Sequence, residues 1–261
     1  MKKTLVPAIA LAAVCGFTDI AAAQTFPTDD PVIKRMWEEG MEDGSQIFDL
    51  AQALLDSIGP RLTGTPGFAA AGDWLLSKYA AWGIEAEKQV YGTWRGWERG
   101  YTHIDLVSPR VRTLEGMMLA WSPGTAGPVE GEVIVPPNFT NTAEFEAWLP
   151  QVAGKMVAIT FPEPTCREDQ SWIDHATPET FDEMVLARNE ARRAFAMSTR
   201  AMGQGSAQRI ADAGALATIS GRWSAGWGVD KIFGSPTDAI PGLHLSCEDY
   251  GLVARMAERG Q

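Results

Sequence analysis

Apolar and polar positions between residues 45 and 82 recur with helical spacing, which predicts two helices joined by a glycine-rich turn. Gly59-Pro60 ends the first helix. In the second, Thr65 stands at the N-cap, Pro66 takes the first helical position and Gly83 ends the helix. The apolar positions are Ile47, Leu50, Leu54, Leu55 and Ile58 in the first helix and Phe68, Ala71, Leu75, Tyr79 and Trp82 in the second.

Short apolar runs bounded by proline and glycine follow, and they predict strands. Strands are expected at 84–91, 113–121, 129–135, 155–161 and 215–220 and just before Ser246. Further helices are expected at 33–41, 142–149, 177–202, 206–213 and 247–259. Arg188, Arg192 and Arg193 are expected on the solvent side of the helix 177–202. The order of elements predicts an α/β protein with a β-rich middle part.

The composition favours a packed globular protein, because 45% of the 261 residues are hydrophobic. A net charge of -11 argues against a nucleic-acid partner, which requires clustered Lys and Arg. Residues 1–23 have a basic start, an apolar core and a small-residue cleavage site, so they predict a signal peptide and export. The apolar run is too short for a membrane span. A lipid anchor at Cys15 is the alternative, which the bulky Val14 disfavours.

Beyond the leader the chain has two cysteines, Cys166 and Cys247. In an exported protein two cysteines either pair in a disulfide or remain unrelated thiols. The sequence leaves both alternatives open.

Four segments resemble the bacterial zinc exopeptidases of the MH clan, of the carboxypeptidase Q-like type. They are IGPRLTGTPG (58–67), LAWSPGT (119–125), VAGKMVAITF (152–161) and IADAGALATIS (210–220). The resemblance implies an incomplete zinc-exopeptidase α/β sandwich, with its leading helices and first strand in 24–105. It also implies a β-rich α+β protease-associated domain at 106–246. A last helix in 247–261 would return towards the missing half of the peptidase.

The resemblance implies two zinc ions, held by a His-x-Asp, an Asp-Asn-Gly turn, a Glu pair, a further Asp and a last His. The chain has three histidines. His103-Ile104-Asp105 has the first spacing but no Asp-Asn-Gly turn after it. His175 is expected in a polar loop, and His244 is expected to be a core histidine. No catalytic or metal-binding residue is therefore assigned, and the metal-binding half is expected to be absent from this chain.

Arg61 and Thr63 are candidates for shaping the cleft of the whole enzyme. The alternative is that Gly59, Gly64 and Gly67 permit a tight turn and that Arg61 caps carbonyl groups.

The expected function is that of an N-terminal fragment of an exported zinc exopeptidase, with a peptide substrate and a second copy of the chain in a homodimer as partners. The alternative is a non-catalytic binding module that uses its tryptophan-rich loops. Trp94, Trp97 and Tyr101 either wall a cleft or, as we expect, brace a packed seam. Trp223 and Trp227 are expected as structural cover. No GxSxG, GxxxxGK[ST], GxGxxG or CxxC motif indicates another chemistry.

Overall fold

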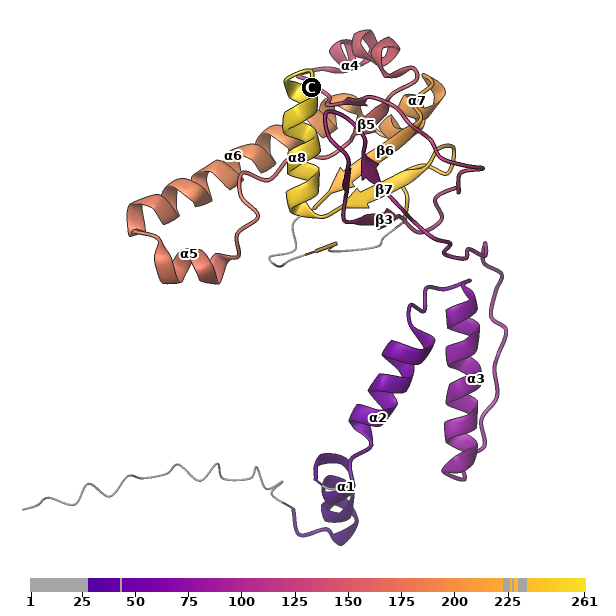
Figure 1. Cartoon of the computed structure of the whole chain (residues 1–261). Helices are drawn as coiled ribbons and strands as arrows, with labels where there is room; N and C mark the ends of the chain where they lie inside the picture. Colours follow the sequence, from indigo (N-terminus) through magenta and orange to yellow (C-terminus); the bar gives the residue numbers. More distant parts are fainter. Residues whose placement is uncertain (1–27, 43, 223–225, 227, 230–233) are drawn as a thin grey trace, which may run out of the picture. The chain divides into compact units, whose positions relative to one another are not determined.

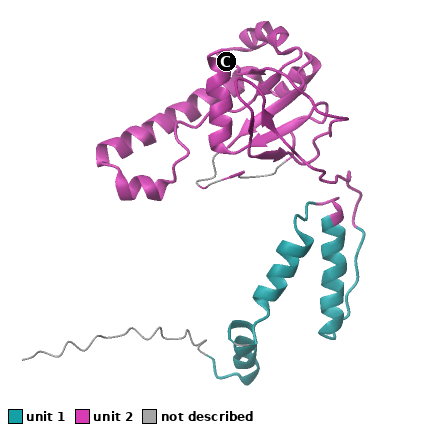
Figure 2. Ribbon diagram, in the orientation of Figure 1, with its two compact units in different colours: residues 1–62, 67–90 teal, residues 63–66, 91–261 magenta. Residues whose placement is uncertain are grey.

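The computed structural model describes residues 28–42, 44–222, 226, 228–229 and 234–261. The expected signal peptide, Trp223 and Trp227 lie outside the described residues. The chain divides into two compact units (Figures 1 and 2). Unit 1 comprises residues up to 62 and residues 67–90, and unit 2 comprises residues 63–66 and 91–261. The units therefore divide after residue 90, whereas the sequence places a domain boundary after residue 105.

Unit 1 is helical: α1 (Pro31–Met41), α2 (Ile47–Gln52), the π-helix η1 (Ala53–Ile58) and α3 (Pro66–Ala81). Asp30 begins α1 because its carboxylate accepts hydrogen bonds from the backbone N–H groups of Val32 (2.8 Å) and Ile33 (3.4 Å). Gly59 ends η1 with a φ of 76°, a left-handed conformation that glycine adopts without a steric penalty. The two helices expected from the apolar spacing are confirmed, and the π-helical turn was not expected.

The strand expected at 84–91 is not formed, and this prediction was wrong. The segment carries no strand, and Val90 and Tyr91 are exposed. A strand requires a neighbour with which to exchange backbone hydrogen bonds. The segment is instead fastened to α3 by the ion pair between Lys88 and Asp73.

Unit 2 contains a five-stranded mixed sheet in the order β3-β7-β6-β5-β4. Its strands are β3 (Gly116–Met118), β4 (Val133–Ile134), β5 (Met156–Ala158), β6 (Ala217–Gly221) and β7 (Gly242–Leu245). Neighbours from β4 to β7 are parallel, and β3 pairs antiparallel with β7. A separate ribbon joins β1 (Asp105–Leu106) to β2 (Arg112–Thr113). The strands expected in unit 2 are therefore present, and β3, β4, β5 and β6 are each shorter than the predicted run.

Helices cover both faces of this sheet, as Figure 1 shows for α8 on one side and α4 and α7 towards the other. On one face, α4 (Thr142–Trp148), the 3-10 helix η2 (Leu149–Val152) and α7 (Ser206–Asp212) contribute to a core around Val157. On the other face, α8 (Cys247–Glu258) packs on a core around Ala158. Val157 and Ala158 point to opposite faces because side chains alternate along a strand. Unit 2 is thus a three-layer α/β fold, more helical than the β-rich domain that the resemblance implies.

The last helix belongs to unit 2. Tyr250, Val253 and Ala254 of α8 are buried in the same core as Ile219 of β6 and Leu245 of β7. The expectation that residues 247–261 form a separate segment returning to a missing half is corrected by this packing. The apolar face of α8 is covered by its own sheet.

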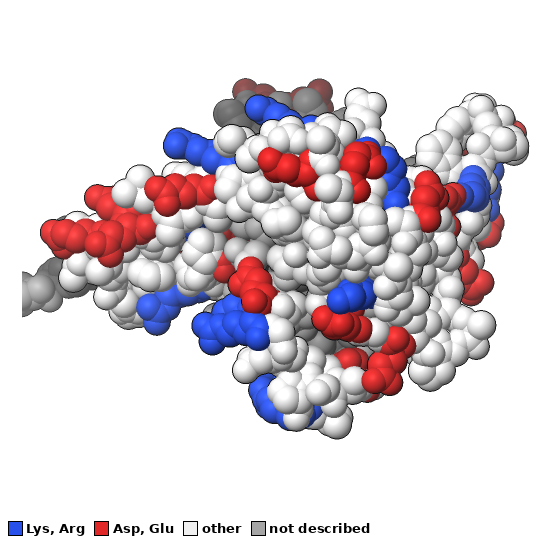
Figure 3. Space-filling view, turned by 90° about the horizontal axis from the view of Figure 1, so that it is seen from above, with Lys and Arg blue, Asp and Glu red and all other residues white. Residues whose placement is uncertain are grey.

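Two further helices extend from the sheet: α5 (Asp169–His175) and the long α6 (Pro178–Met202). Figure 1 shows α5 beside the outer end of α6. The sequence does not predict α5, so the loop expected around His175 is wrong. In Figure 3 acidic and basic side chains are interspersed over the viewed face, consistent with the net charge of -11. None of the described helices is both long and apolar enough to cross a membrane.

Candidate functional site

The carboxyl ends of parallel strands are where open α/β sheets usually bind ligands, and here residues of the chain itself occupy that edge. The Thr160 hydroxyl, just beyond β5, donates to the Gly221 carbonyl (2.9 Å) and accepts from the Gly221 N–H (2.9 Å) at the end of β6. The Tyr250 hydroxyl of α8 donates to the Thr160 carbonyl at 2.5 Å and accepts from its N–H at 3.1 Å. Burial raises the pKa of Tyr250 to about 12, so its hydroxyl keeps its proton at neutral pH.

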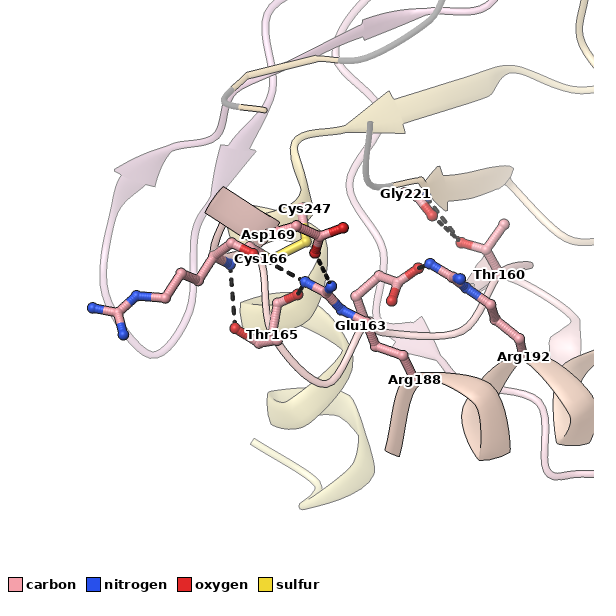
Figure 4. Close-up of polar contacts among 10 residues, drawn as sticks. Thr160, Glu163, Thr165, Cys166, Asp169, Arg188, Arg192, Gly221 and Cys247 are labelled. Carbon is pink, nitrogen blue, oxygen red and sulfur yellow. Dashed lines mark hydrogen bonds and ion pairs between the residues drawn. A yellow bond between two sulfur atoms is a disulfide. The ribbon is translucent and has the colours of Figure 1, made fainter. Parts of the chain in front are cut away.

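Residues 160–169, which we call the edge loop, are held by a buried arginine of α6 (Figure 4). The Arg188 guanidinium donates to the Asp169 carboxylate at 2.5 Å, to the Arg167 carbonyl at 2.9 Å and to the Thr165 carbonyl at 3.4 Å. The expectation that Arg188 faces solvent is wrong, because the residue is buried. A guanidinium has several donors fixed in one plane, so one side chain can hold three acceptors of a loop.

The edge loop is also covalently fastened. Cys166 of the loop and Cys247, the first residue of α8, form a disulfide, with their Cα atoms 5.8 Å apart (Figure 4). This is the paired alternative of the two that the sequence leaves open. The loop is thereby joined to α6 through Arg188 and to α8 through the disulfide.

Glu163 places a titratable group inside this network. Its side chain is 8% exposed, and Arg192 of α6 approaches its carboxylate at 3.7 Å. The second carboxylate oxygen, Oε2, has no hydrogen-bond partner among the described residues. Burial raises the pKa of the Glu163 carboxyl, and the nearby Arg192 and Arg188 oppose that rise without cancelling it. The Glu163 carboxylate is thus buried with only part of its charge compensated by the neighbouring arginines.

The cleft-shaping candidates lie in different units. Arg61 belongs to unit 1, where its guanidinium donates to the carbonyls of Leu54 (2.6 Å) and Gly59 (2.5 Å) at the end of η1. The Gly59 carbonyl follows the last residue of η1, and the Leu54 carbonyl also accepts from the Gly59 N–H at 3.2 Å, so Arg61 caps this helix end as the capping alternative expects. Thr63 belongs to unit 2 and is half-buried. A Cβ on Gly67 would come within 2.2 Å of the Pro60 carbonyl oxygen, so the close turn requires glycine there.

The three histidines serve separate local structures. His103 is exposed and contacts the Asp105 carboxylate at 2.9 Å. His175 is the last residue of α5. His244 of β7 is buried, and the Ser220 hydroxyl lies 3.1 Å from its Nδ1. Among the described residues, no three His, Cys, Asp or Glu side chains are grouped so that they could hold a metal ion. The described residues therefore do not fit the two-zinc centre that the resemblance implies, and we derive no catalytic step through zinc.

An aromatic hollow lies elsewhere in unit 2. Trp94, Arg95 and Trp121 line a space of about 250 Å³. The Trp121 indole N–H donates to the Arg95 carbonyl at 3.0 Å, and the Arg95 guanidinium pairs with Asp238 at 2.6 Å. Trp94 is 67% exposed. We call this feature the tryptophan hollow.

The neighbouring Trp97 braces the structure instead. Its ring lies 6.3 Å from that of Trp121, its indole N–H donates to the Ser122 carbonyl at 3.3 Å, and the Arg99 guanidinium lies over it at 4.6 Å. Tyr101 is fully exposed. Trp97 thus braces the structure, as expected, and Trp94 lines the tryptophan hollow. Trp121, from a distant segment, was missed because no local pattern connects it to Trp94.

Comparison with known proteins gives limited information. No protein-family model matches the chain, and no curated protein matches it. Among solved structures, a peptidase M28 precursor from Shewanella amazonensis SB2B is similar with 18% identity and a TM-score of 0.48, over 88% of this chain and 47% of that one. An aminopeptidase from Aneurinibacillus sp. strain AM-1 is similar with 14% identity and a TM-score of 0.41, over 84% of this chain and 42% of that one.

The chain thus spans less than half the length of both solved structures. TM-scores below 0.5 assign neither a fold nor a function to it.

Proposed function

We propose that this chain is the amino-terminal portion of an exported, zinc-dependent exopeptidase whose zinc ligands come from a further stretch of polypeptide. The reaction of the whole enzyme would be hydrolysis of a terminal peptide bond in a peptide substrate. The order of the four segments that resemble MH-clan exopeptidases supports this proposal. In it, unit 1 supplies helices that pack on the remainder of the catalytic domain.

The observation that carries the proposal is the exposed apolar surface of unit 1. Phe48 of α2 is 86% exposed, and Ile47 and Leu55 are 64% and 59% exposed. Phe68 of α3 and Trp82, just after that helix, are also exposed, and Ala71 is the one residue buried on α3. Large apolar side chains are normally buried, and helices of this length are marginal without a surface to pack against. The apolar stripes predicted from the sequence therefore require a covering surface, which a catalytic sheet would provide.

Reconstitution tests the proposal. The full chain is co-expressed with the polypeptide encoded by the DNA that follows its last codon, and bound zinc and the hydrolysis of aminoacyl p-nitroanilides are measured. We expect hydrolysis only when both polypeptides are present, with loss of activity on chelation and recovery with zinc. An assembled pair that binds no zinc and hydrolyses none of the anilides would contradict the proposal.

A matched pair of variants separates packing from chemistry. Phe48→Ser removes an exposed apolar side chain of unit 1 and is expected to weaken association and activity together. Asp56→Ser changes an exposed polar side chain on the same helical stretch and is expected to leave both unchanged. Equal behaviour of the two variants would show that the apolar surface of unit 1 is not the contact.

A ligand-binding role of unit 2 is a second candidate function, and the tryptophan hollow favours it. Exposed tryptophan is uncommon because its large apolar ring gains free energy from burial. In this reading unit 2 recruits a molecule to the protein and performs no chemistry itself. Saturable binding by the full chain, measured by calorimetry, would support the role, and its abolition by Trp94→Ala would place it at the hollow.

A further inference from the structure

The tryptophan hollow combines two apolar rings with an ion pair at its rim. Trp94 and Trp121 supply the rings, and Arg95 lines the hollow between them. Asp238 binds the Arg95 guanidinium at 2.6 Å, and both of these side chains are more than half exposed. A ligand in the hollow therefore meets flat apolar surfaces together with both hydrogen-bond donors and acceptors.

The hollow is held in shape before any ligand arrives. Trp121 has a φ of 58°, a left-handed conformation that residues other than glycine seldom adopt. Its indole N–H bond to the Arg95 carbonyl (3.0 Å) and its contact with the Trp97 ring stabilise this orientation. A Cβ on Gly64 would lie 2.8 Å from the Trp94 ring, so the Trp94 ring can pack this closely against the backbone at residue 64 only because that residue is glycine. The Trp121 ring is therefore ordered before a ligand binds, which lowers the conformational entropy lost on binding.

The charges decide which chemical class fits. Arg95 is one of the three lining residues, and its positive charge disfavours a cationic ligand. An anionic ligand would meet Asp238, which already compensates Arg95 and stays ionised because Arg95 lowers the pKa of its carboxyl. The paired charges favour a neutral molecule that both donates and accepts hydrogen bonds around an apolar face.

We propose that the tryptophan hollow binds one ring of a neutral saccharide chain. The apolar face of a sugar ring would stack on Trp94 and Trp121, and its hydroxyl groups would bind the Arg95–Asp238 pair. A volume of about 250 Å³ lies below the range of about 300–1,000 Å³ that is typical of pockets for drug-sized ligands. The hollow therefore holds a single ring and leaves the rest of the saccharide in solvent. This inference rests on the second candidate function, the ligand-binding role of unit 2.

Calorimetric titration of the full chain with neutral tetrasaccharides of glucose, N-acetylglucosamine and xylose tests the inference. We expect at least one of them to bind saturably with a Kd of about 0.1–1 mM. Trp94→Ala should weaken that binding about two- to tenfold, because an aromatic stacking contact contributes about 0.5–1.5 kcal/mol. Trp94→Phe should recover part of the loss, and Trp82→Ala, which removes an exposed tryptophan of unit 1, should leave binding unchanged.

Three outcomes would overturn the inference. The first is that none of the three tetrasaccharides binds saturably, and the second is that the Trp94→Ala protein binds as the wild type does. The third is that tetramethylammonium or acetate binds the hollow more tightly than any neutral saccharide. None of these outcomes bears on the exopeptidase proposal, which is decided by zinc and hydrolysis in the reconstituted pair.

Discussion

Opening the disulfide between Cys166 and Cys247 should remove a large part of the stability of unit 2. The two cysteines are separated by 81 residues. Closing a loop of that length restricts the unfolded chain and, in the chain-entropy account, stabilises the folded state by about 4.5 kcal/mol. A domain is typically stable by about 5–15 kcal/mol, so the loss is a large fraction of the total.

The measurement is urea unfolding of the full chain, followed by far-UV circular dichroism, for three samples. These are the oxidised wild type, the wild type in reductant, and the Cys166→Ala/Cys247→Ala protein. We expect the unfolding free energy of unit 2 to fall by about 3–4.5 kcal/mol in both samples that lack the disulfide. The reduced wild type keeps the cysteine side chains, so agreement between it and the double variant separates the cross-link from the packing of Cys247, which is buried.

Hydrogen exchange locates the effect. Backbone amides of the edge loop and of α5 should exchange faster in the reduced protein, because Arg188 then holds the loop without covalent support. A change in unfolding free energy below about 1 kcal/mol on reduction would refute the reasoning. It would mean that the cross-link does not restrict the unfolded chain as the chain-entropy account requires.

Three further predictions concern the same edge of the sheet. Glu163→Gln should become progressively more stable than the wild type as pH rises above the ordinary glutamate pKa of 4.5, because the raised pKa of the Glu163 carboxyl makes folding favour its neutral form. Urea midpoints measured as a function of pH check this, and parallel curves for the two proteins would contradict it. Arg188→Met should cost about 2 kcal/mol in urea unfolding, since it leaves loop carbonyls without donors, and an unchanged midpoint would show that the guanidinium is dispensable. Gly221→Ala should cost about 1–3 kcal/mol, because its Cβ would lie 2.4 Å from the Tyr250 ring, whereas Gly124→Ala, with open space around it, should cost little; equal melting temperatures would refute the clash.

Most helices are predictable from the sequence because their ends carry strong local signals. Thr177 caps α6 through a bond from the Thr180 N–H, Pro178 starts the helix, and Gly203 ends it with a φ of 76°. Ser246 likewise caps α8 by accepting from the Asp249 N–H at 3.4 Å. Where such signals are missing the prediction fails: α5 has no side-chain cap, and its first residue, Asp169, is held by Arg188 from another helix.

The burial of Arg188 could have been inferred from its helical spacing, but its charge favours the opposite assignment. Met184, Arg188, Ser198 and Met202 are the buried residues of α6, and their spacing places them on one helical stripe with Phe195. An arginine on an apolar stripe is easily assigned to solvent, because charged residues seldom lie inside a protein. Its partners, the carbonyls of the edge loop, lie about 20 residues away along the chain and have no pattern of their own.

The tryptophan hollow could be predicted only in part. Trp94 and Trp97 lie close together in the sequence, which leaves open whether they brace a packed seam or wall a ligand cleft. Trp121 comes close to these residues only in the folded sheet, where its indole N–H donates to the Arg95 carbonyl. No local sequence pattern predicts its left-handed backbone conformation. Pairing of Cys166 with Cys247 also depends on the fold, because it requires the edge loop to reach the start of α8.

The most direct test of the central proposal is to read the coding DNA that follows codon 261 in all three forward frames. The account predicts an apolar strand ending in His-x-Asp, followed by an Asp-Asn-Gly turn, in one of those frames. A stop codon with no such signature in the adjacent DNA would contradict the exopeptidase proposal and leave ligand binding by unit 2 as the function to pursue.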